Sequence, residues 1–197
     1  MTRRASGRPK IIFIDRDGVI NKDPGDWTKY SYVTAWGEFH FLPGSKEALK
    51  LLKDNGIKVI IVSNQAGVSK GYFSKSDLDE VNRKMIEEIR LGGGEVEAVY
   101  YCIHQDTDNC ACRKPKTGSF EDAAKKYGID LKDTYFIGDS HVDMAAGKKI
   151  GCKTVFVLSG KASRTEMLGW PQQPDYVAKD LLDAVRSVII GRQGRVR

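Results

Sequence analysis

Two carboxylates, Asp15 and Asp17, follow a short apolar run over residues 11–14 and precede Gly18. Unpaired charge at the end of a buried strand is costly in free energy. Acids at this spacing therefore indicate a site that holds one metal ion and one phosphoryl group. Aspartate and glycine are also frequent in turns, and a solvated turn is the alternative interpretation.

Other polar residues supply what the hydrolysis of a phosphate ester needs. A carboxylate can attack phosphorus to give an aspartyl-phosphate, provided that the negative charge on the phosphoryl oxygens is neutralised. We expect Asp15 to be the nucleophile and Asp17 to be the acid and then the base that activates water. Ser63 is expected to donate to a phosphoryl oxygen and Lys114 to supply a fixed positive charge. Asp139 completes an oxygen site suited to Mg²⁺.

A second group of potential metal ligands lies in the loop of residues 102–112. It has the Cys₃His composition of a closed structural zinc site, and its members are Cys102, His104, Cys110 and Cys112. A chance cluster of buried thiols is the alternative. Arg113 and Lys114 come directly after the last ligand. Structural zinc supplies about 10 kcal/mol toward ordering a segment, so it would fix both cations in place.

Short apolar, β-branched runs alternate with helical patterns along the chain. The expected strands cover residues 11–14, 57–62, 97–102, 134–137, 154–157 and 175–177. The expected helices cover residues 45–55, 76–90, 120–127, 142–150 and 181–190. This alternation predicts an α/β fold with a mostly parallel sheet and helices on both of its faces. Because ligands of such folds bind beyond the carboxyl ends of the strands, the polar residues at four successive strand ends are expected to share one rim.

The segment of residues 21–42 departs most from this alternation. It is rich in aromatic residues, namely Trp27, Tyr30, Tyr32, Trp36, Phe39 and Phe41. A loop of this length inside a domain is commonly a lid or a binding loop. Aromatic side chains that merely pad a β-hairpin are the alternative.

The length of 197 residues fits one domain, which we expect over residues 10–191. The composition, 41% hydrophobic and 29% charged, is typical of a soluble globular protein. No apolar stretch approaches the length of a membrane span, and the first ten residues lack the apolar segment of a secretory signal. We therefore expect a cytoplasmic protein that does not bind membranes.

The net charge of +6 is concentrated at the two ends of the chain. The first ten and the last six residues hold seven of the 32 basic residues and none of the 26 acidic ones, which leaves 25 basic residues against 26 acidic ones. The basic charge thus belongs to flexible tails, expected at residues 1–9 and 192–197. A nearly neutral body disfavours stable binding of nucleic acid.

The ordered motifs of the chain resemble those of the haloacid dehalogenase superfamily of phosphatases. They are Asp15-Arg16-Asp17-Gly18, Ser63-Asn64-Gln65, Lys114-Pro115 and Gly138-Asp139-Ser140, with Asp143 three residues further on. The resemblance implies a Rossmann-like three-layer sandwich and a catalytic Mg²⁺. The ion would be held by carboxylate oxygens of Asp15 and Asp139 and by the backbone carbonyl of Asp17. Asp143 is either an acid behind these ligands or an ordinary aspartate at a helix N-terminus.

The zinc loop, together with the Arg-Lys-Pro and Asp-Arg-Asp-Gly motifs, resembles one small branch of that superfamily. This branch holds D-glycero-D-manno-heptose 1,7-bisphosphate phosphatases and histidinol-phosphate phosphatases, which lack a separate cap domain. Residues 64–73 are more similar to the heptose enzymes. The resemblance implies a Mg²⁺-dependent phosphatase that acts on a small phosphorylated sugar, most of all a heptose bisphosphate. We expect it to be a monomer that holds structural Zn²⁺.

Three other functions are alternatives to the hydrolysis of a heptose bisphosphate. They are hydrolysis of histidinol phosphate, hydrolysis of polynucleotide 3′-phosphates, and binding of zinc and phosphate without catalysis. The last would be favoured by a substitution at Asp15, Asp17 or Asp139, and none is present. For contacts to the substrate we expect Arg16, Asp23, Asp26, Trp27, Asn64, Gln65 and Arg113.

Overall fold

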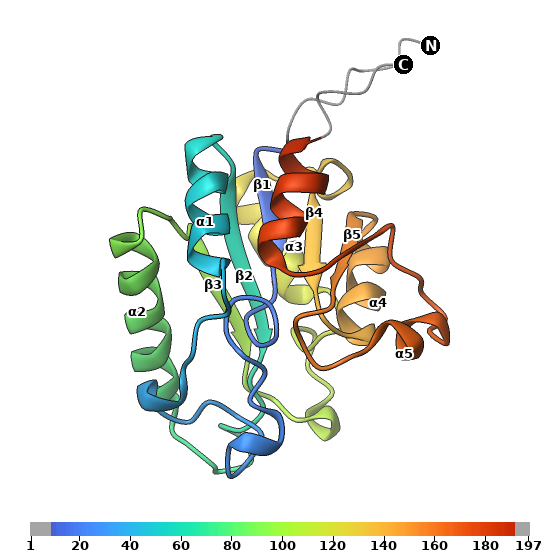
Figure 1. Ribbon diagram of the computed structural model, residues 1–197. Coiled ribbons are helices and arrows are strands. Elements are labelled where there is room, and N and C mark those ends of the chain that lie inside the picture. Colours follow the sequence, from blue (N-terminus) through green and yellow to red (C-terminus); the bar gives the residue numbers. More distant parts are fainter. Residues whose placement is uncertain (1–8, 192–197) are drawn as a thin grey trace, which may run out of the picture.

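A six-stranded, all-parallel sheet lies between two layers of helices in the computed structural model, which describes residues 9–191 (Figure 1). The strand order is β3-β2-β1-β4-β5-β6. The strands are β1 (Ile11–Ile14), β2 (Lys58–Asn64), β3 (Ala98–Cys102), β4 (Tyr135–Gly138), β5 (Lys153–Val157) and β6 (Tyr176–Ala178). The predicted fold class, an α/β sandwich with a mostly parallel sheet, is confirmed, and no cap domain is evident among the described residues.

Helices cover both faces of the sheet (Figure 1). One face carries α1 (Ser45–Asp54), α2 (Lys75–Leu91) and α6 (Leu181–Asp183), which continues as a π-helical segment, Ala184–Ile190. The other face carries α3 (Gly118–Tyr127) and α4 (His141–Ile150). The connections contain the short helices α5 (Arg164–Leu168), η1 (Gly25–Trp27), η2 (Trp36–Glu38), η3 (Asp106–Asp108) and η4 (Leu131–Asp133).

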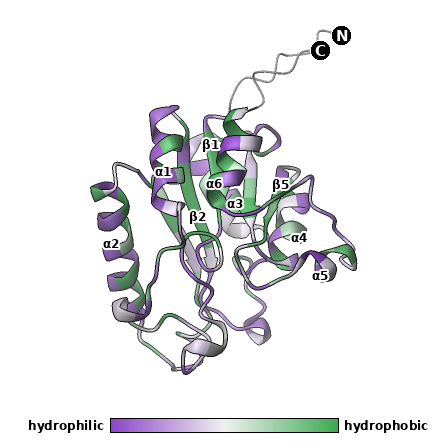
Figure 2. Cartoon of the chain, in the orientation of Figure 1, coloured by the Kyte–Doolittle hydropathy of each residue, from purple (hydrophilic) through white to green (hydrophobic). Residues whose placement is uncertain are grey.

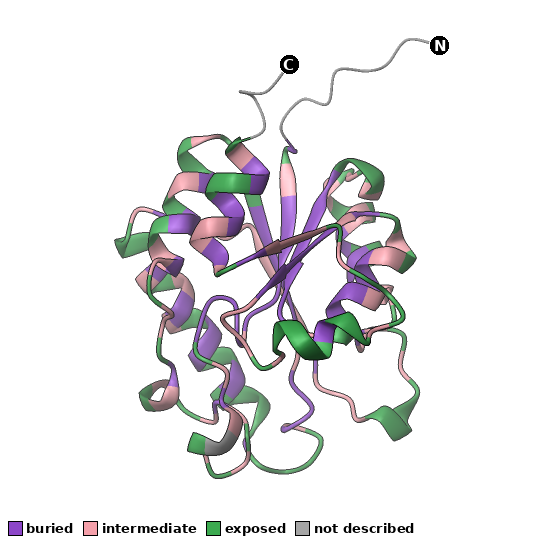
Figure 3. Ribbon diagram, turned by 45° about the vertical axis from the view of Figure 1, so that its right-hand side comes forward, coloured by how far each residue is buried: buried purple, intermediate pink, exposed green. Residues whose placement is uncertain are grey.

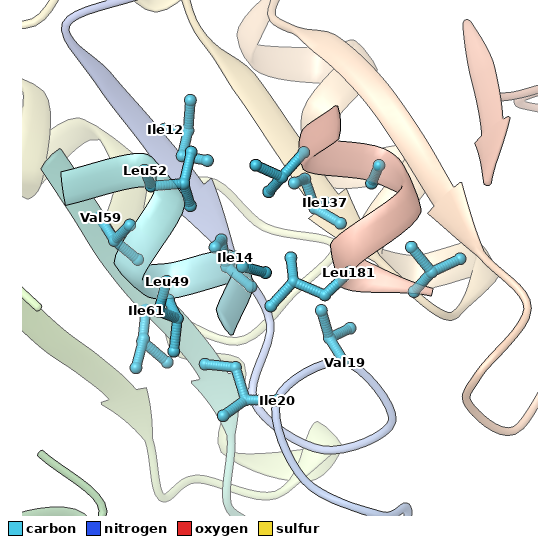
Figure 4. Packing of buried hydrophobic residues seen from close by; sticks show 14 of the residues in the cluster. Ile12, Ile14, Val19, Ile20, Leu49, Leu52, Val59, Ile61, Ile137 and Leu181 are labelled. Atoms are coloured by element: carbon cyan, nitrogen blue, oxygen red, sulfur yellow. The ribbon is translucent and has the colours of Figure 1, made fainter. Parts of the chain in front are cut away.

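The core follows from the alternation of side chains along each strand, because successive residues point to opposite faces of a sheet. In β1, Ile12 and Ile14 belong to one cluster of buried residues, whereas Phe13 belongs to another. Figure 4 shows the first cluster, where the two isoleucines lie close to Leu49 and Leu52 of α1. Burial on both faces explains why β1 has no polar residue before its end.

The helices are amphipathic, with one apolar side toward the sheet. Figure 2 shows hydrophobic and hydrophilic residues alternating along α2, and Figure 3 shows exposed residues on the outer helices and buried ones along the central strands. The buried residues of α2 recur at helical spacing, as Leu78, Val81, Met85 and Ile89. Its first turn is closed by a capping box, in which Ser74 and Asp77 exchange side-chain to backbone hydrogen bonds.

Three elements differ from the sequence prediction. β2 extends to Asn64, so Ser63 lies inside the strand rather than after it. The predicted helix at residues 181–190 changes from α to π geometry after Asp183. The short helix α5 has no counterpart in the prediction, because its single turn buries only Met167 and leaves no detectable periodicity.

The aromatic segment of residues 21–42 divides between the core and the surface. The part that packs against the first core cluster contains Trp36, Phe39 and Phe41. Asn21 and Phe41 form an antiparallel bridge, so the segment leaves and returns at one place. Tyr30 and Tyr32 instead line a pocket. One part of the segment therefore packs in the core and another part lines the pocket.

The predicted flexible tails lie outside the described residues, apart from Pro9, which is buried. The domain boundaries expected at residues 10 and 191 thus rest on the sequence alone. Within residues 9–191, none of the helices combines the length and the apolar character needed to cross a membrane.

Candidate active site

Polar side chains from the ends of β1, β2 and β4 surround one pocket of about 510 Å³. Asp15 follows β1, Ser63 is the last residue but one of β2, and Asp139 follows β4. Lys114, from the loop between β3 and α3, completes this wall. In Figure 1 the connecting loops gather at the same lower end of the sheet. The carboxyl ends of parallel strands meet at one edge, which brings these residues together.

Lys114 is a buried cation that ties three parts of the site together. Its Nζ lies 2.9 Å from Asp15 Oδ1 and 2.7 Å from Asp143 Oδ1, and it donates to the Val62 carbonyl at 2.9 Å. Burial acts to lower the pKa of Lys114, but the charges of Asp143 and Asp15 raise it above its usual value. The ammonium therefore stays charged beside Asp15, and removing Lys114 would leave two buried acids without their shared cation.

Three acids lie close together beside this lysine. The carboxylates of Asp15, Asp139 and Asp143 place one oxygen each within 4.8 Å of one another. Burial raises the pKa of Asp15 to about 7; Lys114 opposes the rise, and Asp143 adds to it. Burial, together with the charges of Asp143 and Asp15, also raises the pKa of Asp139 well above its usual value. A divalent cation would relieve this repulsion, and the oxygen donors suit Mg²⁺.

The three acids differ in their surroundings, and Asp143 and Asp139 each contact further groups. Asp143 contacts Lys114 and accepts a hydrogen bond from the Ser140 amide at 3.1 Å, which caps α4. Asp139 Oδ2 accepts from the Lys161 amide at 2.9 Å. Asp143 is fully buried and does not line the pocket, whereas Asp15 and Asp139 do. The geometry thus suits Asp15 and Asp139 as cation ligands with Asp143 behind them.

Asp17 is held beside the pocket by donors from three directions. Its carboxylate accepts from Arg16 Nη2 at 3.0 Å, from Asn21 Nδ2 at 2.8 Å and from Gln65 Nε2 at 2.7 Å. The same Gln65 amide donates to Ser63 Oγ at 2.8 Å. This network fixes the expected acid and the expected hydroxyl donor relative to each other.

Of Arg16, Asn64 and Gln65, which the sequence predicts to contact the substrate, the structure places Asn64 in the pocket lining. Arg16 and Gln65 are buried and do not line the pocket; they support Asp17 as described above. Asn64 lines the pocket, yet its amide exchanges two 3.0 Å hydrogen bonds with the backbone of Lys114. These three side chains position the residues around them.

The other residues that the sequence predicts to contact the substrate lie partly inside and partly outside the pocket lining. Asp23 lines the pocket. Trp27 does not; it is 38% exposed and donates to the Asp23 carbonyl at 2.6 Å. Arg113 does not line the pocket either, because its Nε pairs with Asp106 Oδ1 at 2.6 Å. The side chain of Asp26 lies outside the described residues.

The Cys₃His group converges in the loop that follows β3. Cys112 Sγ lies 3.0 Å from Cys102 Sγ, 3.5 Å from Cys110 Sγ and 3.3 Å from His104 Nδ1. All four ligand atoms fall within 4.8 Å of one another, as four ligands around one ion require. Burial acts to raise the pKa of Cys110, but the Arg113 amide and the neighbouring thiols lower it to about 7. The donor set fits zinc, whose thiolate ligands must be deprotonated.

Two glycines allow the backbone to pack directly against Asp139. A Cβ atom at Gly160 would lie 2.0 Å from Asp139 Oδ2, and one at Gly18 would lie 2.2 Å from the same oxygen. Gly18 also has a φ of +78°, in the left-handed region that favours glycine. Glycine at both positions therefore leaves room for the carboxylate to reach the pocket.

Sequence reasoning assigned no substrate contact to several residues that line the pocket. They are Tyr30, Ser31, Tyr32, Lys70, Tyr72, Ser140 and Lys161. The tyrosines belong to segments whose aromatic content was apparent, but nothing in that content distinguished Tyr30 and Tyr32 from Trp36. Lys161 follows β5, an end that carried no motif.

The parallel sheet, the Asp15–Asp17 pair after its first strand and the buried lysine at the same edge define a HAD-like phosphatase. A family model described as HAD-hydrolase-like matches residues 111–184. Among solved structures, the D,D-heptose 1,7-bisphosphate phosphatase from B. bronchiseptica, complexed with magnesium and phosphate, superimposes with a TM-score of 0.82. The two chains are 33% identical, and the match covers 90% of this chain and 96% of the other.

Two further relatives identify the family within the HAD-like phosphatases. The D-glycero-β-D-manno-heptose-1,7-bisphosphate 7-phosphatase of Neisseria meningitidis is 38% identical over 156 residues, which are 79% of this chain and 81% of the relative. The protein of that name from Pseudomonas aeruginosa is 36% identical over 180 residues, 91% of this chain and 97% of the relative. The chain belongs to the D-glycero-D-manno-heptose-1,7-bisphosphate 7-phosphatase family.

Proposed function

We propose that this chain is a Mg²⁺-dependent phosphatase that removes the 7-phosphate of D-glycero-β-D-manno-heptose 1,7-bisphosphate. One observation carries the proposal: Asp15 lines the pocket with Lys114 Nζ at 2.9 Å and with Asp139 in the same acid cluster. A nucleophile, a fixed cation and a place for a divalent ion are what attack on a phosphate ester requires. The names of the relatives support the choice of sugar.

In the first step, a carboxylate oxygen of Asp15 attacks phosphorus, and the bond from phosphorus to the sugar oxygen breaks. The product is an aspartyl-phosphate. Asp17, protonated at that stage, gives its proton to the departing sugar oxygen. Lys114 and the Ser63 hydroxyl stabilise the charge on the phosphoryl oxygens. Lys114 suits this role because its position is fixed before substrate binds.

In the second step, Asp17 acts as the base. Its carboxylate takes a proton from water, the water oxygen attacks phosphorus, and the bond between phosphorus and Asp15 breaks. Inorganic phosphate leaves, and Asp15 is restored as a carboxylate. The hydrogen bonds from Arg16, Asn21 and Gln65 fix the position of the Asp17 carboxylate for this step.

Two metal ions belong to the proposal. Asp15 and Asp139, with the Asp17 backbone carbonyl, would hold Mg²⁺, which polarises phosphoryl oxygens when it is bound. Cys102, His104, Cys110 and Cys112 would hold a structural Zn²⁺. The magnesium and phosphate in the relative from B. bronchiseptica support the first assignment.

Histidinol phosphate is the second candidate substrate. The observation that favours it is the row of tyrosines, Tyr30, Tyr32 and Tyr72, that lines the pocket, because an aromatic wall also suits an imidazole ring. The two substrates are compared directly in the test below.

The test is phosphate release from heptose 1,7-bisphosphate and histidinol phosphate, with Mg²⁺ and with a chelator. We expect Mg²⁺-dependent release, fastest from the bisphosphate. Asp15→Asn should lower kcat by on the order of 10⁴-fold or more, since it removes the nucleophile. Asp54→Asn, at an exposed carboxylate on α1, serves as the matched control and should retain turnover. Undiminished turnover in Asp15→Asn would contradict the proposed mechanism.

A further inference from the structure

We propose that Asn82, in the middle of α2, positions Asp17 through the side chain of Arg16. The inference rests on the proposed function, in which Asp17 moves both protons, and it gives a role to a helix that contributes no residue to the pocket lining. Asn82 is 6% exposed and is the polar member of the buried face of α2. Its place among apolar side chains needs a physical reason, because burying an amide costs free energy unless the amide is hydrogen-bonded.

The side chain of Asn82 contacts a residue that lies 66 positions earlier in the chain. Arg16 Nη1 donates to Asn82 Oδ1 at 3.4 Å. The Asn82 Nδ2 group is buried and has no hydrogen-bond partner among the described residues. A leucine would cover the same part of the core without leaving a buried donor unpaired. The contact of the amide oxygen with Arg16, rather than packing, therefore explains an asparagine here.

Arg16 connects this contact to the reacting groups. Its side chain is buried, its Nε lies 3.2 Å from Asp17 Oδ1, and its Nη2 lies 3.0 Å from Asp17 Oδ2. A planar guanidinium that meets a carboxylate with two nitrogens fixes the orientation of the carboxylate as well as its position. The third nitrogen, Nη1, contacts Asn82 instead. The guanidinium is therefore held on one side by the acid and on the other side by α2.

The contact with Asn82 matters because an arginine side chain turns about several single bonds. Fixing one more nitrogen restricts the planes that the guanidinium can adopt, and the plane of the guanidinium sets the plane of the Asp17 carboxylate. Transfer of a proton to the departing oxygen depends on that orientation. We therefore expect that loss of the Asn82 oxygen slows proton transfer by Asp17 and leaves Asp15 and Lys114 in place.

The test compares two substrates whose leaving groups differ in their need for a proton. The sugar oxygen of heptose 1,7-bisphosphate takes a proton from Asp17 as it leaves, whereas nitrophenolate is stable enough to leave 4-nitrophenyl phosphate as an anion. The value of kcat/KM reports the first step, in which the ester is cleaved, and not the later attack by water. In Asn82→Leu we expect kcat/KM for the heptose bisphosphate to fall by about 10- to 100-fold and kcat/KM for 4-nitrophenyl phosphate to change little.

Two further variants test whether the effect comes from the missing oxygen and passes through Arg16. Asn82→Ala removes the same acceptor without the bulk of leucine, and it should lower the ratio of the two kcat/KM values as well. Arg16→Lys keeps the charge but lacks the planar fork. When Asn82→Leu is added to Arg16→Lys, the ratio should fall no further, because the group through which Asn82 acts is already gone.

Ile89→Ala is the matched control. Ile89 lies on the same buried face of α2 as Asn82, two turns further along the helix, within the apolar core. This variant should lower the melting temperature, because it removes buried apolar atoms, and it should keep the ratio of the unsubstituted protein. Thermal unfolding of every variant thus separates a loss of stability from a loss of proton transfer.

Three results would overturn the role of Asn82 and leave the proposed function standing. They are an unchanged ratio in the Asn82 variants, an equal loss with both substrates, and a further loss when Asn82→Leu is added to Arg16→Lys. If the unsubstituted protein released no phosphate from heptose 1,7-bisphosphate in the presence of Mg²⁺, the proposed function would fail instead. Phenyl phosphate, whose phenol is a weaker acid than nitrophenol, would then take the place of the sugar in the ratio and decide the role of Asn82.

Discussion

Asp15, Asp139 and Asp143 concentrate negative charge around Lys114, and this makes the stability of the metal-free protein depend on pH. Burial raises the pKa of Asp15 from 3.8 to about 7. Between those values the unfolded chain releases a proton that the folded chain keeps. The folded state therefore loses stability as the pH rises through this range. Burial of Asp15 beside the other acids therefore lowers the stability of the folded protein when no cation is bound.

Asp15→Asn removes this ionisation, and it should therefore stabilise the metal-free protein at high pH. We expect the melting temperature of Asp15→Asn to exceed that of the unsubstituted protein by an amount that grows from pH 4 to pH 8. The measurement is thermal unfolding in the presence of a chelator, with Asp54→Asn as the control. A difference that stays constant across this range would contradict the raised pKa of Asp15.

At the scale of elements, the loop between β3 and α3 connects two sites. Cys112, the last residue of the Cys₃His group, lies two positions before Lys114, and Asn64 at the end of β2 holds the Lys114 backbone from the other side. A bound zinc ion would therefore restrict the position of the cation that faces Asp15. Positioning is a large part of catalysis, since a displacement of about 1 Å can lower the rate by about 100-fold.

Loss of zinc should consequently lower turnover even when Mg²⁺ is saturating. We expect Cys110→Ser to contain less than one zinc per chain and to lose up to about 100-fold in kcat/KM. The measurements are metal content by mass spectrometry and phosphate release. Cys152→Ala, at a buried thiol outside the loop, is the control and should keep its zinc. Full turnover in a zinc-free protein would show that the loop needs no metal.

At the scale of the whole molecule, stability and chemistry lie in different parts. The largest cluster of buried residues fills the space between the sheet and the helices α1, α2 and α6 (Figure 4). The pocket lies beyond the strand ends. Since no cap domain is evident among residues 9–191, the walls of the pocket come from loops of this single sandwich.

A substitution in the core should therefore change stability more than it changes chemistry. Leu49→Ala is expected to lower the free energy of unfolding by about 2–5 kcal/mol and to leave kcat nearly unchanged. Leu91→Ala, at the 76% exposed end of α2, is the matched control and should change stability little. Urea unfolding gives both values. Equal effects of the two substitutions would contradict this assignment of the core.

The fold class and the edge of the sheet where the chemistry lies follow from the residue pattern alone. Runs of apolar residues identify the buried strands. Because the carboxyl ends of parallel strands lie at one edge of the sheet, the pattern predicts that Asp15 and Asp139 are neighbours. The Cys₃His group was equally apparent, because its members lie close together along the chain. These inferences need only local periodicity and one geometric rule.

The partner of each cation depends on the folded structure. No local pattern encodes the pairing of Arg113 with Asp106, the burial of Arg16 against Asp17 or the place of Lys70 in the pocket lining. Each depends on where side chains meet after the chain has folded. A charged residue has the same sequence signature whether it faces a substrate or a neighbouring acid, because the difference lies in its contacts rather than in its type.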